Sequence, residues 1–162
     1  MNTFVLSTAT ILAIIEASHT RLVDPPPMPL VFAVIMVESS GRPDAVNEGS
    51  GCVGLMQLSS IGLRDIEERL AKPGELPPFA TEPRRKDPLF NVTGGSIYLR
   101  WLIKRWPDDL DRALVGYNWG PGNARKWDGD HGSLPRETAT YIQRVRSWMD
   151  VYEEKKRGES DV

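Results

Sequence analysis

The sequence predicts a single domain that is mainly α-helical, and three observations support this fold class. The chain has 162 residues, which is enough to bury one hydrophobic core. Its composition, 40% hydrophobic and 26% charged, is typical of an ordinary globular protein. Apolar segments of helical length alternate with loops rich in proline and glycine, and no segment has a strong alternating pattern of the strand type.

A first helix is predicted from about Ser7 to about Leu22, where isoleucine and leucine recur at helical spacing. The apolar run of residues 4–17 is similar to a secretion signal, but no Lys or Arg precedes it and Glu16 interrupts it. The run is also too short and too polar to span a bilayer. We therefore interpret residues 1–22 as an N-terminal helix packed on the rest of the protein. We expect no export signal and no stable membrane insertion.

A second helix is predicted after the proline cluster of residues 25–27. Asp24 is a good N-cap, and Pro25 suits the first helical position, where no N–H is needed. Residues 28–37 are apolar throughout, which fits either a buried strand or a buried helix. The Asp-Pro start favours a helix that is buried on every side and ends near residues 39–41.

The rest of the chain is predicted to hold a small hairpin and four further helical segments. The hairpin lies near residues 44–54, irregular loops lie at 71–88 and 127–135, and the helices lie at about 55–70, 89–106, 110–117 and 138–154. Residues 23–150 form the main domain in this interpretation. The charged residues 151–162 are expected to be a flexible tail.

Charge and cysteine content exclude several classes of function. The net charge is −2, so no overall field attracts nucleic acid, and we expect no nucleic-acid partner. Cys52 is the only cysteine, which excludes an intramolecular disulfide. With only two histidines besides, the sequence has no ligand spacing of the zinc type. We expect neither a metal nor a cofactor.

Glu38 is an acid at the end of the apolar second helix. On a helix, its own face carries Val31, Val34 and Ile35. Apolar surroundings and the negative end of the helix dipole both disfavour a charged carboxylate and raise its pKa. A carboxyl that stays protonated near neutral pH is what a general acid needs. On this evidence alone the alternative is favoured, in which Glu38 only marks where a core helix reaches solvent.

Three further segments carry neutral polar groups between apolar and glycine residues. They are residues 54–58 (GLMQL), 113–122 (ALVGYNWGPG) and 137–145 (ETATYIQRV). Amide, hydroxyl and backbone groups are suited to bind sugar hydroxyls and N-acetyl groups, because each makes a directional neutral hydrogen bond. Together with Glu38, these segments indicate a carbohydrate site.

At these residues the sequence resembles the lytic transglycosylases of the soluble type, which are relatives of goose-type lysozyme. That family carries, in order, an acid-serine pair after an apolar helix, Gly-Leu-Met-Gln, Ala-Tyr-Asn with Gly-Pro-Gly, and Glu-Thr-x-x-Tyr. The matching residues are 38–39, 54–57, 116–122 and 137–141, and residues 87–99 match the family's Asp-Pro-x-x-Asn-Ile segment. The resemblance covers about residues 20–146. It implies a lysozyme-like fold, mainly α with a minimal hairpin, in a single compact catalytic domain with a substrate cleft.

The resemblance also implies an activity, which is cleavage of the β-1,4 bond between N-acetylmuramic acid and N-acetylglucosamine in peptidoglycan. Glu38 would protonate the leaving oxygen and then act as a base toward the C6 hydroxyl of the same muramoyl residue. The product would be a 1,6-anhydro sugar. Most glycosidases need two carboxylates, but one is enough if the substrate supplies its own nucleophile.

Further site residues follow from the resemblance. Gln57, Tyr117 and Asn118 would bind the sugar around the cleaved bond. Met56 and Tyr141 would shape the groove, and Glu137 would hold Tyr117 or Asn118 in place. Three departures or additions complete the expected substrate-binding set. Ser39 follows the acid, Asn47 (or else Ser50) stands where the family has a serine, and Trp119 stands where alanine is usual. Trp119 would stack on a sugar ring or cap the last helix.

Two alternatives stay open at this point. One is a muramidase, a peptidoglycan hydrolase of the same fold in which a second acid activates water. The candidates for that acid are Asp44, Glu48, Asp65, Asp128 and Asp130. The other is a non-catalytic peptidoglycan-binding module.

The expected partner is the glycan strand of peptidoglycan, and the expected state is a monomer. The cell wall and periplasm lie outside the inner membrane, yet no export signal is visible. This combination fits a bacteriolytic phage endolysin, an enzyme delivered by a secretion apparatus, or a domain of a longer chain.

Overall fold

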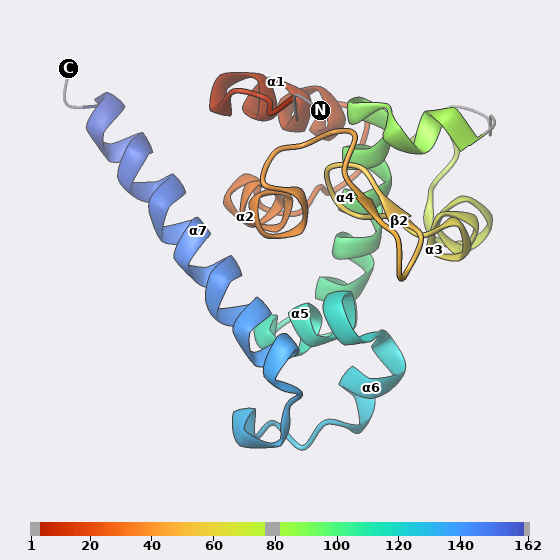
Figure 1. Ribbon diagram of the computed structural model, residues 1–162, viewed down its shortest axis with the longest axis vertical. Coiled ribbons are helices and arrows are strands. Elements are labelled where there is room, and N and C mark those ends of the chain that lie inside the picture. The colour runs from red at the N-terminus through yellow and green to blue at the C-terminus, as the bar shows by residue number, and fades with distance from the viewer. Residues whose placement is uncertain (1–3, 77–81, 161–162) are drawn as a thin grey trace.

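The computed structural model describes residues 4–76 and 82–160, and over these residues the chain is mainly helical. Figure 1 shows the arrangement. The α-helices are α1 (Thr8–His19), α2 (Met28–Ser39), α3 (Ser60–Asp65), α4 (Pro88–Arg105), α5 (Leu110–Trp119), α6 (Pro121–Lys126) and α7 (Arg136–Ser160). A π-helical turn, Ile66–Leu70, continues α3, and 3-10 turns lie at Glu82–Lys86 and His131–Ser133. The strands β1 (Val46–Asn47) and β2 (Cys52–Val53) pair antiparallel as the small hairpin that the sequence predicts.

Helix α2 begins later than the sequence predicts. Its first residue is Met28 and its N-cap is Pro27, whereas Asp24 has a left-handed backbone with φ 61° and makes no cap. Pro25 and Pro26 each precede another proline, which disfavours the helical conformation. Helix α1 begins at Thr8, where the Ser7 hydroxyl accepts a hydrogen bond from the Thr10 N–H, and it ends at His19 rather than near Leu22.

The C-terminal region is more helical than the sequence predicts. The sequence predicts no helix between about residues 117 and 138, but Pro121–Lys126 form α6. Helix α7 continues to Ser160 instead of ending near Glu154, so residues 151–160 are helical, and the flexibility of this charged end stays a prediction. Tyr152 is buried in the core at the start of this stretch, and the Glu, Lys and Arg residues that follow are good helix formers that continue the helix.

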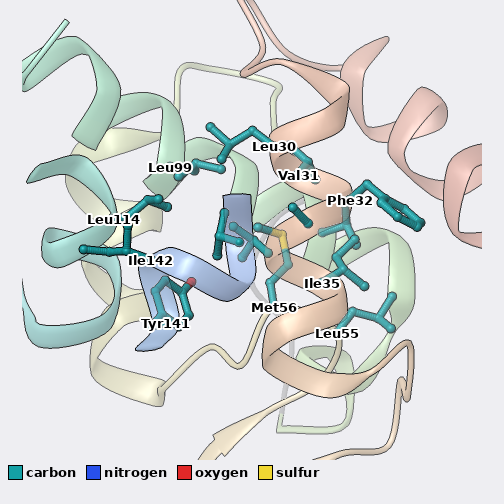
Figure 2. Packing of buried hydrophobic residues seen from close by; sticks show 14 of the residues in the cluster. Leu30, Val31, Phe32, Ile35, Leu55, Met56, Leu99, Leu114, Tyr141 and Ile142 are labelled. Carbon is teal, nitrogen blue, oxygen red and sulfur yellow. The ribbon is translucent and has the colours of Figure 1, made fainter. Parts of the chain in front are cut away.

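The main core surrounds α2. Residues 30–35 of this helix are all buried, and Figure 2 shows Leu30, Val31, Phe32 and Ile35 facing the other members of the cluster. Helix α7 covers one side of α2, where the Phe32 ring packs against Trp148 and Tyr152. Helix α1 packs against α4 and also touches α2. A helix that is enclosed on all sides has a fixed axis, so its last turn is held in a defined place.

A second, smaller core lies under the turn after β2. Its buried members are Leu22, Leu58, Leu63, Ile66, Phe90 and Ile97. Because Leu58 also bridges to Val53, the predicted helix from Leu55 starts only at Ser60, and residues 54–58 form a tight turn. This turn faces the main core through Leu55 and Met56, both fully buried.

Candidate active site

A cavity of about 560 Å³ lies where the end of α2 meets α5 and the start of α7. Four residues of the predicted site line it, namely Glu38, Asn118, Glu137 and Tyr141. The other lining residues are Val37, Arg136, Thr140 and Arg144. The structure therefore brings together side chains that lie about a hundred positions apart in the chain.

Glu38 reaches this cavity because α2 ends abruptly after it. Ser40 has a left-handed backbone with φ 54°, and its N–H closes the last turn on the Met36 carbonyl. Gly41 follows with φ 75°, which suits a residue without a side chain. The chain thus turns away one residue after Ser39, and Glu38 stays on the last helical turn, between the core and the cavity.

The environment of Glu38 raises its pKa from 4.5 to about 7. The largest cause is burial, which disfavours the carboxylate, and the nearby charge of Glu137 adds to it. The Tyr141 hydroxyl and the Arg144 guanidinium act in the opposite direction and lower the pKa in part. At neutral pH the carboxyl is therefore divided between its protonated and ionised forms, as the sequence argument for a general acid requires.

Tyr141 lies with its hydroxyl beside the Glu38 carboxyl. Its side chain is buried, and its oxygen has no partner with full hydrogen-bond geometry among the described residues. Burial, followed by the Glu38 charge, raises the pKa of Tyr141 well above its usual value. The group is consequently a neutral O–H donor at any physiological pH, placed next to Glu38.

Tyr117 and Asn118, at the end of α5, are held by partners that the sequence did not predict. The Tyr117 hydroxyl donates to the Met56 carbonyl at 2.9 Å, and the Thr138 hydroxyl donates to Asn118 Oδ1 at 2.8 Å. Glu137 makes no hydrogen bond or ion pair among the described residues. Among these residues the structure thus shows no bond by which Glu137 would hold Tyr117 or Asn118, and that role stays a prediction, while the charge of Glu137 raises the pKa of Glu38.

The turn of residues 54–58 is fixed by Asn91, a fully buried residue of α4. Its side-chain amide donates to the Val53 and Arg85 carbonyls at 2.9 and 2.7 Å, and its oxygen accepts from the Met56 N–H at 2.7 Å. Gly54, with φ 83°, packs so closely that an added Cβ would lie 2.3 Å from the Asn91 amide nitrogen. This contact explains the glycine of the Gly-Leu-Met-Gln motif.

Gln57 and Met56 stabilise this turn through hydrogen bonds and packing. Gln57 has φ 50°, and its amide donates to the Ala45 and Gly54 carbonyls at 3.2 and 2.9 Å. The Met56 side chain is buried against Gly95. Their direct contact with a sugar stays a prediction.

Three other predicted site residues lie outside the cavity lining. Ser39 is buried and donates its hydroxyl to the Ile35 carbonyl. Asn47 is exposed in the hairpin, where its side-chain oxygen accepts from the Gly49 and Ser50 N–H groups. Trp119 is 39% exposed at the end of α5, next to Asn118. Among the described residues, the Trp119 ring and the Asn47 amide nitrogen are accessible to a ligand, whereas Ser39 is not.

Sequence patterns did not indicate Thr138 as a contact, or Arg136, Thr140 and Arg144 as lining residues. A signal for two of them was present, because positions 137, 140, 141 and 144 share one face of a helix. Among the residues that the structure describes, no three metal-ligating side chains gather in one place. None of the helices within 4–76 and 82–160 has the length and apolar character to cross a bilayer.

Fold and cavity together define a class, that of mainly helical, lysozyme-like domains with one partly buried acid in a cleft. The family model described as "Transglycosylase SLT domain" matches residues 13–140, and the chain belongs to this family.

Solved structures agree with this assignment. An inactive mutant of the lytic transglycosylase Slt from Pseudomonas aeruginosa matches with a TM-score of 0.74 and 23% identity over 92% of this chain. The 70 kDa soluble lytic transglycosylase from Escherichia coli matches with a TM-score of 0.76 and 22% identity over 89%. The chain spans 24% of each of these proteins. At such identity the likeness shows the fold, and it confirms the predicted fold class.

Proposed function

We propose that the protein is a peptidoglycan lytic transglycosylase in which Glu38 is the general acid and base. The observation that carries the proposal is the raised pKa of Glu38, about 7, in a cavity lined by an amide and hydroxyl groups. Membership of the transglycosylase SLT domain family and the lytic transglycosylases among the structural matches support it.

In the first step, Glu38 gives its proton to the glycosidic oxygen between N-acetylmuramic acid and N-acetylglucosamine. The bond from that oxygen to C1 of the muramoyl residue breaks, and the N-acetylglucosamine end leaves as an alcohol. Positive charge develops at C1, and the neighbouring acetamido oxygen of the substrate stabilises it. An acid with a pKa near 7 is protonated often enough to do this at neutral pH.

In the second step, the Glu38 carboxylate takes the proton of the C6 hydroxyl while O6 attacks C1. The product is the 1,6-anhydromuramoyl end, Glu38 is protonated again, and no water is consumed. The Tyr141 hydroxyl, buried beside the carboxyl and without a full hydrogen bond, donates to the carboxylate formed between the two steps. This role fits its neutral state.

A hydrolase of the same fold is the second candidate, and one observation favours it. Glu137 is a second carboxylate in the same cavity, and its charge reaches Glu38. For the role of second acid, Glu137 replaces the candidates that the sequence offered. Those candidates do not line the cavity, and they are Asp44, Glu48, Asp65, Asp128 and Asp130. In that mechanism Glu137 would activate a water molecule.

Digestion of purified sacculi in ¹⁸O-labelled water distinguishes these functions by product mass. A transglycosylase releases anhydromuropeptides, which are one water lighter than hydrolysed muropeptides and carry no ¹⁸O. We expect this product from the native chain and from Glu137→Gln. For Glu38→Gln we expect at least a thousandfold slower release, because removing a general acid and base eliminates the proton transfers of both steps.

Labelled, hydrated products from the native chain would contradict the transglycosylase and favour the muramidase, above all if Glu137→Gln abolished them. Absence of any release, with tight binding to sacculi retained, would favour the non-catalytic binding module. The expected monomer, the glycan-strand substrate in the cell wall, and delivery by a phage or a secretion apparatus belong to the same proposal.

A further inference from the structure

The contact between Thr138 and Asn118 determines which side of an amide faces the cavity. Thr138 lies in the first turn of α7 and is only 2% exposed, while Asn118 is half-buried at the end of α5 and lines the cavity. The Thr138 hydroxyl donates to Asn118 Oδ1 at 2.8 Å. Carbonyl oxygens only accept, so the single hydroxyl hydrogen of Thr138 is committed to this bond.

The amide nitrogen of Asn118 is left for a ligand. It makes no hydrogen bond among the described residues, and it is not among the buried polar atoms that lack a partner, so the cavity is open to it. Two N–H donors are therefore accessible to solvent on a residue that lines the cavity. Because the amide oxygen of Asn118 is held by Thr138, the orientation of its NH₂ group is fixed, and this group is suited to donate to a ligand.

We propose that Thr138 is a positioning residue that holds Asn118 so that its NH₂ group donates to an acceptor oxygen of the bound sugar. The inference rests on the proposed function of the cavity and adds the direction of one hydrogen bond to it. The acceptor belongs to the class of carbonyl and ether oxygens, such as the acetamido carbonyl or the ring oxygen. A substrate that offers only a donor at this place is bound less well.

Burial of Thr138 is what makes the arrangement stable. At 2% exposure its hydroxyl is shielded from solvent, so a water molecule does not readily replace the bond. The side chain is β-branched, which restricts its rotamers on a helix. Without the hydroxyl, the Asn118 amide is free to turn over, and its oxygen then faces the acceptor of the sugar and repels it.

The first test is a double-mutant cycle on kcat/KM for anhydromuropeptide release from sacculi. Thr138→Val keeps the shape of the side chain but removes the hydroxyl, and we expect about a five- to tenfold loss, the effect of one net hydrogen bond. Thr138→Ser restores the hydroxyl and should recover most of this loss. In an Asn118→Ala background, the change from Thr138 to valine should have no further effect on kcat/KM.

A purely structural Thr138 would behave differently. It would lower kcat/KM by the same factor in both backgrounds, and the loss would follow the melting temperature rather than the presence of Asn118. That outcome overturns the proposal. Melting temperatures of the native chain and of the four variants are measured alongside, with Arg125→Gln, an exposed position outside the cavity lining, as the surface control.

The second test, Asn118→Asp, keeps the acceptor for Thr138 and the size of the side chain but removes both N–H donors. If Asn118 donates to the sugar, this variant should lose kcat/KM as strongly as Asn118→Ala at every pH from 5 to 8. Activity near the native level at any pH in that range would show that Asn118 accepts from the sugar, and it would overturn the proposal.

The failure of this inference is separable from failure of the proposed function. If the native chain releases no muropeptides, the proposed function fails. If the native chain is active and Thr138→Val equals it, only the role of Thr138 fails.

Discussion

The helical wall of the cavity and a hairpin segment outside the cavity lining, named the hairpin wall, use their polar groups in different ways. The helical wall, formed by the ends of α2 and α5 and the start of α7, presents polar groups that have no backbone partner among the described residues, namely the Glu38 carboxyl with the Tyr141 hydroxyl beside it and the Asn118 amide nitrogen. In the hairpin wall, residues 44–58, polar side chains form hydrogen bonds within the segment. Asn47 closes its own turn, and Gln57 bonds to two carbonyls of the same segment.

Residues of one set of family motifs therefore serve two purposes, which are the chemistry of the site and the shape of the hairpin segment. The helical wall has defined positions because packed helices hold it, so its polar groups are free for chemistry. The hairpin wall lies on a two-stranded ribbon, which has marginal stability by itself, and it needs every local hydrogen bond to keep its shape. We therefore expect changes in the helical wall to alter proton transfer, and changes in the hairpin wall to alter stability.

The largest effect is expected for Gly54→Ala in the hairpin wall. The new Cβ would lie 2.3 Å from the Asn91 amide nitrogen, at a glycine with φ 83°. Close contact with a buried, hydrogen-bonded side chain and a left-handed backbone should together cost about 3 kcal/mol of unfolding free energy or more. Denaturant unfolding measures the loss.

Gly51→Ala is the matched control for this prediction. Gly51 lies in the same hairpin with φ 69°, but nothing stands within 4 Å of its added Cβ. Only the backbone strain remains, and we expect a loss of about 1 kcal/mol. Equal losses at the two positions would mean that the contact with Asn91 does not hold the hairpin wall.

A smaller effect, opposite in sign, is expected for Glu38→Gln in the helical wall. The pKa of Glu38 is raised by folding from 4.5 to about 7, so between these values the folded state binds more protons than the unfolded state. The free energy of unfolding of the native chain therefore falls as the pH rises from about 4.5 to 7. Once the pH is above 7 the total loss is up to about 2 kcal/mol, after allowance for partial solvent access.

Glutamine does not ionise, so the variant escapes this loss. The free energy of unfolding of Glu38→Gln minus that of the native chain should therefore be larger at pH 8 than at pH 4. Denaturant unfolding at both pH values measures this difference. The same exchange at the exposed Glu137 is the control for the loss of one carboxylate. A stability difference that does not change with pH would contradict the raised pKa.

The smallest effect is expected from the charges on α7 that face Glu38. Arg144 lowers the pKa of Glu38 and Glu137 raises it. Arg144→Gln should therefore move the pKa seen in the pH profile of kcat/KM upward, and Glu137→Gln should move it downward, each by about 0.3 unit for exposed charges. High salt should shrink both shifts. Shifts in the same direction would show that neither charge acts through Glu38.

Much of the fold could be predicted from the sequence because its helices follow long apolar runs. The buried α2 and the acid on its last turn are examples, since ten apolar residues followed by Glu-Ser-Ser-Gly allow few other arrangements. Helix α6 could not be predicted in this way. The residues Gly-Pro-Gly at its start indicate a break, and a helix of six residues leaves too short a pattern to detect.

The candidate site could be predicted only as far as its motifs. Which residue holds Asn118 depends on how α5 meets α7, and the partner is Thr138 rather than its neighbour Glu137. The role of Asn91 depends on a contact between residues 35 or more positions apart. Side-chain pairs of this kind are set by tertiary packing, and no local pattern in the sequence encodes them.

The burial of α2 also has a consequence for how such an enzyme adapts. Residues 30–35 have no solvent-facing position, so evolutionary drift in this helix is confined to exchanges that keep the volume of the core. The charges that adjust Glu38 stand instead on the exposed face of α7, where substitutions leave the core untouched. Lineages can thus shift the pH of best activity through surface residues, while the helix that carries the acid stays the same.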